Sequence, residues 1–500
     1  MALEETEVSP AGETARSWWR DGVLYQIYPR SFADSNGDGI GDLGGIVDRL
    51  DYLEWLGVDG IWLNPTFPSP NVDWGYDVAD YTSVHPDFGT LDDLDRLVAE
   101  AGRRGIRVLL DLVPNHTSVR HPWFEGEHRD WYVWADEPTN WRSVFGGSAW
   151  ERDERDGRYY LHSFLTEMPD LNWHVPAVRD EFERVMRFWL ERGIAGFRVD
   201  VVHRTVKDLR LRDTKQRGRV ARFPPTDVDG THELIRNWRA LADSYDPQRL
   251  LVGETYVLDV AEMATFYGAA ADELHLAFNF QFLFSELAAA SLRRAVELTE
   301  QALPARAWPV WTGSNHDVVR FPTRWCDGDE RKARCALLVL LTLRGTPFLY
   351  YGDEVGMEQA AAPEPPLDPA RPPRDGCRTP MPWDDRAPAI TWLPHGDLSR
   401  NVEAQRGTDR STLELGRALI SLRREFVREP YETLRSPPGT WAWRRGPYSV
   451  AVNLSERALT VPAVEGSVRL STDRSREGEP VDGRLRLEPW TGVVVGTMGS

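Results

Sequence analysis

The 500-residue chain has a formal net charge of -19, with 78 acidic and 59 basic side chains, so its mean field repels nucleic-acid phosphates and anionic membrane surfaces. This charge argues against a nucleic acid or a membrane as partner and favours a neutral small molecule. The length exceeds what one ordinary hydrophobic core supports, so two or three structural parts are expected.

The N-terminal segment, the absence of long apolar stretches and the cysteines indicate the cellular compartment. Residues 1–19 are acidic and lack an apolar run, and no apolar stretch of eighteen residues occurs anywhere. We therefore expect residues 1–17 to be a flexible N-terminus, with no signal peptide and no membrane span. Cys326, Cys335 and Cys377 have no metal-ligand spacing, which is typical of reduced thiols. These features predict a cytoplasmic protein.

A loop rich in glycine and aspartate, DSNGDGIGDLGGI, follows the first apolar run. Its D-x-N-x-D-G-x-G-D spacing is that of a calcium-binding loop, in which alternate residues supply oxygen ligands. A full EF-hand would have a glutamate where Gly45 stands. Both a structural Ca²⁺ or Mg²⁺ site and a plain solvated turn fit this pattern, and we expect no organic cofactor. The candidate ligands are the side chains of Asp34, Asn36, Asp38 and Asp42 and the carbonyl of Ile40.

Eight short apolar, β-branched runs alternate with amphipathic helical stretches from residue 22 to about residue 355. Helices are expected over 44–57 and 176–193, and Thr90 with Asp93 resembles a helix N-terminal cap. Alternating strands and helices imply a parallel sheet, and eight such units predict a closed (β/α)8 TIM barrel. The predicted strands are residues 22–28, 57–63, 106–113, 193–201, 249–255, 273–280, 308–314 and 345–351.

Two interruptions of this alternation of strands and helices predict further domains. After the third strand the chain is rich in Trp, Gly, Pro and charge and lacks periodicity, so residues 115–174 are expected to form a small inserted domain. After a last barrel helix, alternating segments predict a C-terminal antiparallel β-sandwich over 426–500. The barrel is then residues 18–114 and 175–425.

Three of the predicted strands end in an acid. Parallel strands of a barrel finish at one rim, so Asp200, Glu254 and Asp317 should share it. Arg198, two residues before Asp200, points the same way and should keep Asp200 ionised. Neighbouring carboxylates should raise the proton affinity of Glu254. Structural ion pairs are the alternative, but three acids on one rim favour catalysis.

Such a carboxylate pair suits retaining cleavage of a glycosidic bond. Asp200 would attack the anomeric carbon while Glu254 protonates the leaving oxygen and later deprotonates water. Asp317 would bind sugar hydroxyls and stabilise the transition state. His116 and His316, at the ends of the third and seventh strands, would donate hydrogen bonds to hydroxyls nearby.

These residues lie in segments that resemble the conserved segments of the α-amylase family of glycoside hydrolases, glycoside hydrolase family 13. MPDLNW, from Met168, is similar to a further segment of that family, and DSNGDGIGD with RTPMPW resembles its oligo-1,6-glucosidase and α-glucosidase branch. The resemblance spans nearly all of residues 18–500 and implies the same roles for the three acids. The four main segments are DLVPNH, GFRVDVVH, LVGETY and GSNHD, beginning at residues 111, 196, 251 and 313.

The resemblance also implies how the substrate is held. In WGYDVADY, Asp77 and Tyr76 resemble residues that bind the terminal glucose, and Arg378 resembles an arginine that joins Asp77. A charged pair closing one end of the site would make the enzyme an exo-acting α-glucosidase. In this branch the aspartate-rich loop is a structural calcium or magnesium site away from the acids.

The sequence does not decide which glycosidic linkage is cleaved or which acceptor receives the glucosyl group. Val201 resembles α-1,6-preferring members, whereas Met168 stands where a glutamine is expected. If loops with aromatic walls such as Trp383 exclude water, the same glucosyl-enzyme would transfer glucose to a sugar or alcohol, including isomerase-type chemistry. A catalytically inactive binding or chaperone subunit is a more distant alternative. The expected partner is a small α-glucoside, and the protein is expected to be a monomer or homodimer.

Overall fold

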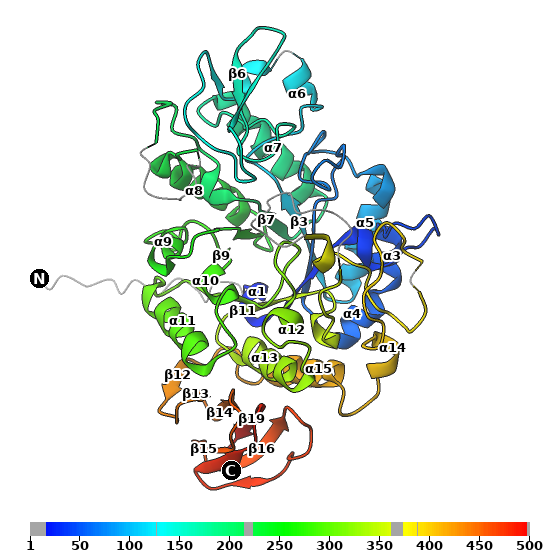
Figure 1. The fold of residues 1–500 in the computed structure, drawn as a ribbon, viewed down its shortest axis with the longest axis vertical. Coiled ribbons are helices and arrows are strands. Elements are labelled where there is room, and N and C mark those ends of the chain that lie inside the picture. Colours follow the sequence, from blue (N-terminus) through cyan, green and yellow to red (C-terminus); the bar gives the residue numbers. More distant parts are fainter. Residues whose placement is uncertain (1–16, 127, 215–223, 362–373, 388, 498–500) are drawn as a thin grey trace, which may run out of the picture.

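The computed structural model describes residues 17–126, 128–214, 224–361, 374–387 and 389–497. All but the last residue of the predicted flexible N-terminus, 1–17, lies outside this part of the chain. Along the long axis of the molecule, the barrel lies between a small inserted part at one end and the C-terminal sheets at the other (Figure 1).

Eight parallel strands form the central sheet, in the order β10-β11-β1-β2-β3-β7-β8-β9. Among the described residues no ladder of hydrogen bonds joins β9 to β10, so the ring is nearly closed. Each predicted strand contains one of these eight, which confirms the TIM barrel. The strands are β1 Leu24–Ile27, β2 Gly60–Leu63, β3 Arg107–Leu112, β7 Gly196–Val199, β8 Leu250–Gly253, β9 Leu276–Ala277, β10 Val310–Thr312 and β11 Thr346–Tyr350.

Helices surround the barrel strands (Figure 1). They are α1 Trp18–Asp21, α2 Pro29–Phe32, α3 Leu43–Asp48, α4 Leu50–Leu56, α5 Leu91–Arg103, α7 Pro176–Glu191, α8 Val228–Asp243, α9 Val260–Thr265, α10 Phe280–Leu283, α11 Ala289–Ala302, α12 Phe321–Arg324, α13 Glu330–Thr342, α14 Val402–Gln405 and α15 Thr412–Arg423. Short 3-10 turns are η1 Pro86–Phe88, η2 Arg129–Trp131, η3 Val202–Arg204, η4 Asp353–Val355 and η5 Arg374–Cys377. In the described part of the chain, no helix is long and apolar enough to cross a membrane.

The helix expectations were met in two places and corrected in one. Thr90 and Asp93 form a reciprocal capping box at the start of α5. Helix α7 buries Val178 and Phe182 as its periodicity predicted. The single helix expected over 44–57 is instead two helices, because the N–H of Arg49 bonds to the carbonyls of both Ile46 and Val47 and tightens the turn.

Between β3 and α7 the chain leaves the barrel and forms a small antiparallel sheet in the order β4-β6-β5. This part carries few regular elements, as its composition predicted, and it lies at one end of the molecule (Figure 1). The exact boundaries of the inserted domain stay predictions. Its elements are α6 Pro122–Glu125, β4 Trp134–Ala135, β5 Trp150–Arg152 and β6 Tyr159–Leu161.

The C-terminal part is antiparallel, as predicted. One sheet has the order β12-β13-β14-β19-β16-β17, and a second pairs β15 with β18. Apolar side chains from both sheets, such as Val461 and Leu487 from the smaller and Val493 from the larger, form one buried cluster. The strands are β12 Tyr431–Leu434, β13 Thr440–Arg445, β14 Tyr448–Asn453, β15 Leu459–Pro462, β16 Gly466–Ser471, β17 Pro480–Val481, β18 Arg484–Leu487 and β19 Thr491–Gly496.

A buried arginine attaches these sheets to the barrel helices. The guanidinium of Arg445, on β13, donates to the Thr342 carbonyl at 2.7 Å, at the end of α13. It also donates to the carbonyls of Phe426 and Val427 at 3.0 and 2.8 Å. The last carbonyls of a helix have no donor within the helix, and the Arg445 guanidinium supplies hydrogen bonds to them.

Candidate active site

The register of three barrel strands brings four charged residues together. In the pairing of β3 with β7, Asp111 lies directly opposite Arg198. In the pairing of β7 with β8, Val199 lies opposite Gly253, so the residues that follow, Asp200 and Glu254, are neighbours. Parallel strands end at the same rim, and this register therefore delivers both predicted catalytic acids to one place.

A glycine permits the close approach of β7 to β8. Gly196 has φ of 147°, and a Cβ atom there would lie 2.0 Å from the Leu250 carbonyl oxygen. Any other residue would push β7 away from β8. Since Arg198 and Asp200 follow on the same strand, Gly196 helps to set their distance from Glu254.

Arg198 is the centre of the site and is only 2% exposed. Its Nη1 donates to Asp200 Oδ1 at 2.7 Å and to Asp111 Oδ1 at 2.8 Å, and its Nη2 donates to Glu254 Oε2 at 2.7 Å. The indole ring of Trp62 covers the guanidinium at 5.1 Å. Asp200 and Glu254 are each one hydrogen bond from the same planar group, as a closely spaced retaining pair requires.

The ionisation of this pair differs from the expectation. Burial raises the pKa of Asp200 well above its usual value, the Arg198 charge opposes the rise, and the Glu254 and Asp111 carboxylates add to it. Arg198 does not single out Asp200, because it binds Glu254 equally well. The expectation that Arg198 keeps Asp200 ionised is therefore not supported by the site.

The third acid, Asp317, lies at the mouth of the site and is the most exposed of the three. Arg378 Nη2 and Arg374 Nη1 donate to its Oδ1 at 2.9 and 3.1 Å. Burial works against its ionisation, but the neighbouring His316 and the guanidinium charges of Arg374 and Arg378 prevail and hold the pKa of Asp317 well below its usual range. Asp317 is therefore ionised, as a stabiliser of a cationic transition state must be.

A directional hydrogen-bond chain links Asp317's neighbour His316 to Asp111. The Gln26 amide nitrogen donates to Asn64 Oδ1 and to His316 Nδ1, at 2.8 and 2.9 Å, so the ring proton of His316 is assigned to Nε2. That Nε2 lies 2.6 Å from the Tyr76 hydroxyl, which donates to Asp111 Oδ2 at 3.0 Å. Tyr76 and His316, both predicted at the site, are thus held by the barrel itself.

His116 is placed beside the site, but its ring is already bonded. Its Nε2 lies 3.2 Å from the Tyr76 carbonyl, and its Nδ1 lies 3.0 Å from the Asn115 amide nitrogen. Burial lowers the pKa of His116 to about 4, so the ring is neutral near pH 7. The predicted donation to a sugar hydroxyl would require this ring to leave the Tyr76 carbonyl.

A buried lysine holds the inserted part against this corner of the barrel. Lys207 Nζ donates to Asn115 Oδ1 and to the Arg204 carbonyl, both at 2.5 Å, and lies 3.2 Å from Asp170 Oδ2. Asp170, from the MPDLNW segment, is fully buried. Lys207 therefore orients Asn115, which in turn orients His116.

We expect Lys207→Met to lower the free energy of unfolding by about 3–5 kcal/mol, because the buried Asp170 carboxylate would lose its cation. Urea unfolding at neutral pH measures this change. Lys332→Met is the control, since Lys332 lies over the Trp490 ring and touches no acid in the site. A loss below about 1 kcal/mol would assign the pair no structural role.

The predicted contact between Asp77 and Arg378 is not present in the structure. The Asp77 carboxylate faces its own loop and accepts hydrogen bonds from Ser69 Oγ at 2.7 Å and from the N–H groups of Val72 and Asp73 at 3.0 Å. Those three donors satisfy its oxygens. Arg378 instead binds Asp317 and the His316 carbonyl.

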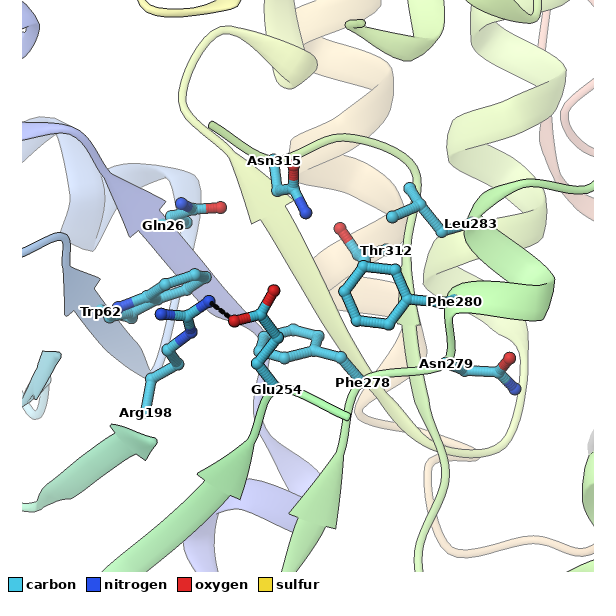
Figure 2. A pocket seen from close by; sticks show the side chains of 10 residues that line it. All are labelled: Gln26, Trp62, Arg198, Glu254, Phe278, Asn279, Phe280, Leu283, Thr312 and Asn315. Carbon is cyan, nitrogen blue, oxygen red and sulfur yellow. Dashed lines mark hydrogen bonds and ion pairs between the residues drawn. The ribbon is translucent and has the colours of Figure 1, made fainter. Parts of the chain in front are cut away.

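The pocket beside Glu254 has an apolar wall (Figure 2). The rings of Phe278 and Phe280 lie next to the carboxylate, whereas Asn279 points away and donates to Thr299 Oγ1 at 2.8 Å. The cavity has room for about one water molecule, the size needed for a hydrolytic water or for a small acceptor group. Its lining is Gln26, Trp62, Arg198, Glu254, Phe278, Asn279, Phe280, Leu283, Thr312 and Asn315.

The aspartate-rich loop is closed by its own hydrogen bonds. Its side-chain oxygens accept backbone N–H groups two residues on: Asp34 from Asn36, Asn36 from Asp38, and Asp38 from Ile40, at 2.8–3.0 Å. The bonded oxygens of Asn36 and Asp38 each keep a lone pair for an oxygen-ligated cation, whereas Asp34 Oδ1 also accepts from the Gly37 N–H at 2.7 Å.

Asp42 fits that ligand set least well. Its Oδ1 caps helix α3 through the Gly45 N–H at 2.6 Å, and both of its oxygens accept from Ser35 Oγ. In the part of the chain that the structure describes, no group of three or more His, Cys, Asp or Glu side chains is arranged to hold a metal. The metal site therefore stays a prediction.

The structure changes one further expectation, on Trp383, and adds a contact for Val201. Trp383 does not wall the site, because its indole packs on Phe32 and Tyr52 and donates to the Phe32 carbonyl at 2.6 Å. Val201 has a left-handed backbone with φ of 34°, and its N–H donates to Glu254 Oε2 at 3.1 Å. A β-branched residue is strained in this region, so Val201 positions the acid through its backbone.

Several site residues were missed in the sequence. Asp111 lies in the DLVPNH segment but received no role, although its place two residues from the end of a predicted strand is a usable signal. Asp73 and Arg374, which lie in long loops, carried no periodic or strand-end signal. Gln26 and Asn64 resemble ordinary polar residues at strand ends until the barrel closes.

The barrel, the acid pair on one guanidinium and the third acid beside them define a glycoside hydrolase with a carboxylate mechanism. A family model described as the alpha amylase catalytic domain matches residues 26–429. The chain belongs to the α-amylase family.

Similar proteins extend over most of the chain. A protein named probable alpha-glucosidase from Rhizobium meliloti (strain 1021) is 40% identical, covering 85% of each chain. An oligo-1,6-glucosidase from Parageobacillus thermoglucosidasius is 35% identical, covering 82% of this chain and 84% of its own. A solved structure of an alpha-glucosyl transfer enzyme, XgtA, is 36% identical with a TM-score of 0.88, covering 96% of this chain and 99% of its own.

Proposed function

We propose that the protein is a retaining, exo-acting α-glucosidase that releases terminal α-linked glucose from short oligosaccharides through a glucosyl-aspartate intermediate. The observation that carries this proposal is the joint contact of Asp200 and Glu254 with Arg198. Similarity to a probable alpha-glucosidase and to an oligo-1,6-glucosidase supports the substrate class.

In the first step Asp200 attacks the anomeric carbon while Glu254 protonates the departing oxygen, so the leaving alcohol takes the proton of Glu254. The bond from carbon to Asp200 forms as the glycosidic bond breaks. Once Asp200 is an ester its charge is gone, and Glu254 becomes the base that accepts a proton from the incoming water. Arg198 remains bonded to Glu254 and Asp111 and compensates their charge in both steps.

Trapping the intermediate tests this proposal. The protein is incubated with a 5-fluoro-α-glucosyl fluoride, which reacts but turns over slowly, and the peptides are weighed. We expect one added fluoroglucosyl group on the peptide that contains Asp200. A label elsewhere, or none in a protein that still hydrolyses p-nitrophenyl α-glucoside, would contradict the assigned nucleophile. Separate incubations with maltose, isomaltose and sucrose then assign the linkage.

Glucosyl transfer is the second candidate. The structural similarity to an alpha-glucosyl transfer enzyme favours it, and so does the apolar wall of Phe278 and Phe280 beside Glu254, which suits a sugar ring or an alcohol better than bulk water. Product analysis with and without an added alcohol separates transfer from hydrolysis. With all three acids in one connected site, we set the inactive-subunit alternative aside.

A structural Ca²⁺ or Mg²⁺ in the aspartate-rich loop is also part of the proposal. Asp34, Asn36 and Asp38, with the Ile40 carbonyl, would hold it, and the Gly39 carbonyl ties the loop to Thr391 at 2.8 Å. We expect a chelator to lower the melting temperature of the wild type but not that of Asp38→Asn. Equal shifts in both proteins, or no shift in either, would remove the ion from this loop.

We place the enzyme in the cytoplasm as a monomer or homodimer. Its three buried, unpaired cysteines support a reducing compartment. Size-exclusion chromatography with light scattering measures the oligomeric state.

A further inference from the structure

Gln26, on β1, joins two segments of the site through the nitrogen of its side-chain amide. Its Nε2 lies 2.8 Å from Asn64 Oδ1, after β2, and 2.9 Å from His316 Nδ1, after β10. All three side chains are buried. Because buried polar groups need partners within the protein, the direction of each of these hydrogen bonds is decided by the neighbouring residues and not by bulk water.

These directions follow from the Tyr76 hydroxyl, which has one proton and three polar neighbours. The neighbours are Asp111 Oδ2 at 3.0 Å, Asn64 Nδ2 at 2.9 Å and His316 Nε2 at 2.6 Å. Asp111 pairs with Arg198, and as a carboxylate it can only accept, so it takes the Tyr76 proton. Asn64 and His316 then both donate to the two lone pairs of the Tyr76 hydroxyl.

This requirement extends to Gln26. Because the Asn64 nitrogen donates to Tyr76, the Asn64 oxygen faces Gln26, and only the amide nitrogen of Gln26 can donate to it. The same nitrogen faces His316 Nδ1, which therefore carries no proton. Turning the Gln26 amide over would place two oxygens 2.8 Å apart. In Figure 2 the Gln26 oxygen lies on the side of the pocket that contains Glu254.

The surroundings of His316 act on its protonation in opposite directions. Burial lowers the pKa of His316 well below its usual value, the Asp317 carboxylate opposes this effect, and nearby guanidinium groups reinforce it. Asp317 Oδ2 lies 3.4 Å from His316 Nε2 and favours an imidazolium. An imidazolium would need a proton on Nδ1, where the Gln26 N–H already points. The ionisable groups that face the ring are Asp317, Arg198, Arg374, Arg378, Tyr28 and Tyr76.

The charge of His316 matters because of its distance from Asp317. The sugar becomes positively charged in the transition state of glycoside cleavage, and Asp317 is the carboxylate that stabilises this charge. An imidazolium at 3.4 Å would compensate Asp317 and repel the sugar cation. A neutral His316 with one N–H, on Nε2, avoids both effects.

We infer that Gln26, held in place by Asn64, is a positioning residue that fixes the tautomer of His316 and keeps a second proton off its ring. This inference rests on the proposed α-glucosidase function. Gln26 acts through His316 and not on the sugar.

Nitrogen-15 spectra of protein labelled at its histidines test the tautomer directly, and comparison with His316→Gln assigns the signals. For the wild type we expect a protonated Nε2 and an unprotonated Nδ1 of His316 between about pH 5 and 8. In Gln26→Glu the new carboxylate would accept a proton bond from Nδ1. We therefore expect both ring nitrogens to be protonated over part of that range.

Activity tests the consequence. Gln26→Glu is expected to lower kcat/KM for p-nitrophenyl α-glucoside at least about 10-fold at about pH 6. Its raised imidazolium pKa means that activity is lost below that pKa, so the acidic limb of the pH profile should move to higher pH. Gln26→Met removes the donor at similar volume and should shift the limb less, in the same direction. It carries the test if Gln26→Glu does not fold.

Gln405→Glu is the matched control. Gln405, on α14, is also a partly buried glutamine with two bonds, to the Val355 carbonyl at 2.9 Å and from the Leu413 N–H at 3.1 Å, and it is not part of the site. The control should keep the pH profile of the wild type. Thermal unfolding measures whether each variant folds.

Three results would overturn the inference: a wild-type His316 with a proton on Nδ1, folded Gln26 variants whose His316 signals match those of the wild type, or variants with changed signals and an unmoved pH profile. The last would mean that the tautomer has no effect on the reaction. A wild type inactive on the glucoside would refute the proposed function instead, and the spectra would still locate the His316 proton, so the two failures are distinguishable.

Discussion

Asp200→Asn is expected to lower kcat by at least about 10⁴-fold while the protein stays folded, because a neutral amide cannot attack the anomeric carbon. Asparagine has nearly the same shape and can still accept the hydrogen bond from Arg198 at this position. The loss should therefore be chemical and not structural. Residual activity near that of the wild type would remove Asp200 from its role.

The same substitution is expected to change how the free energy of unfolding depends on pH. Burial raises the pKa of Asp200 in the folded protein, so the folded state binds this proton more tightly than the unfolded chain, whose aspartate pKa is about 3.9. Ionisation of Asp200 therefore lowers the free energy of unfolding of the wild type as the pH rises above about 4. Asparagine cannot ionise, and the stability of the variant relative to the wild type should grow over that range.

Hydrolysis of p-nitrophenyl α-glucoside measures the first effect, and urea unfolding at acidic and at neutral pH measures the second. Asp384→Asn is the control, since Asp384 pairs with Arg386 at the surface, outside the site. It should match the wild type in activity. A relative stability of Asp200→Asn that falls with rising pH would show that Asp200 is held ionised.

Arg198→Met is expected to cost about 3–5 kcal/mol of unfolding free energy at neutral pH and to abolish turnover. The reason is that Asp111, Asp200 and Glu254 would keep their mutual repulsion without the cation that binds all three. The cost should shrink at acidic pH, where these carboxylates take up protons.

Arg198→Lys separates charge from geometry. An ammonium restores a positive charge but cannot present two nitrogens in one plane to two carboxylates, so we expect part of the stability and little of the activity to return. Denaturant unfolding and kcat/KM measure the two quantities, with Arg386→Met as the control for an exposed arginine. Full activity in the lysine variant would mean that the shared planar contact is dispensable.

The strands and the acids could be predicted because their signals are local. Apolar runs with β-branched residues mark buried strands, and a parallel barrel places every strand end on one rim, so Asp200, Glu254 and Asp317 follow from strand order alone. The contact of Arg198 with Asp200 follows from the two-residue period of a strand. These inferences need no knowledge of how the loops fold.

The loop residues could not be predicted in this way. Asp73 and Asp77 lie four positions apart in one loop, and nothing in their spacing says which carboxylate turns toward an arginine and which accepts hydrogen bonds from its own backbone. Arg374 and Arg378 have the same ambiguity after β11. The outcome depends on backbone conformation, including the left-handed Trp74, and on contacts with segments far away in sequence.

The sequence by itself determined the barrel, the antiparallel C-terminal part, the family and the three acids, because those depend on periodicity, strand order and residue type. Only the tertiary structure decided that Arg198 binds Asp111, Asp200 and Glu254 alike. It also decided that Arg374 pairs with both Asp73 and Asp317. Hydrogen-bond partners and local charge arise from segments that meet only when the chain folds.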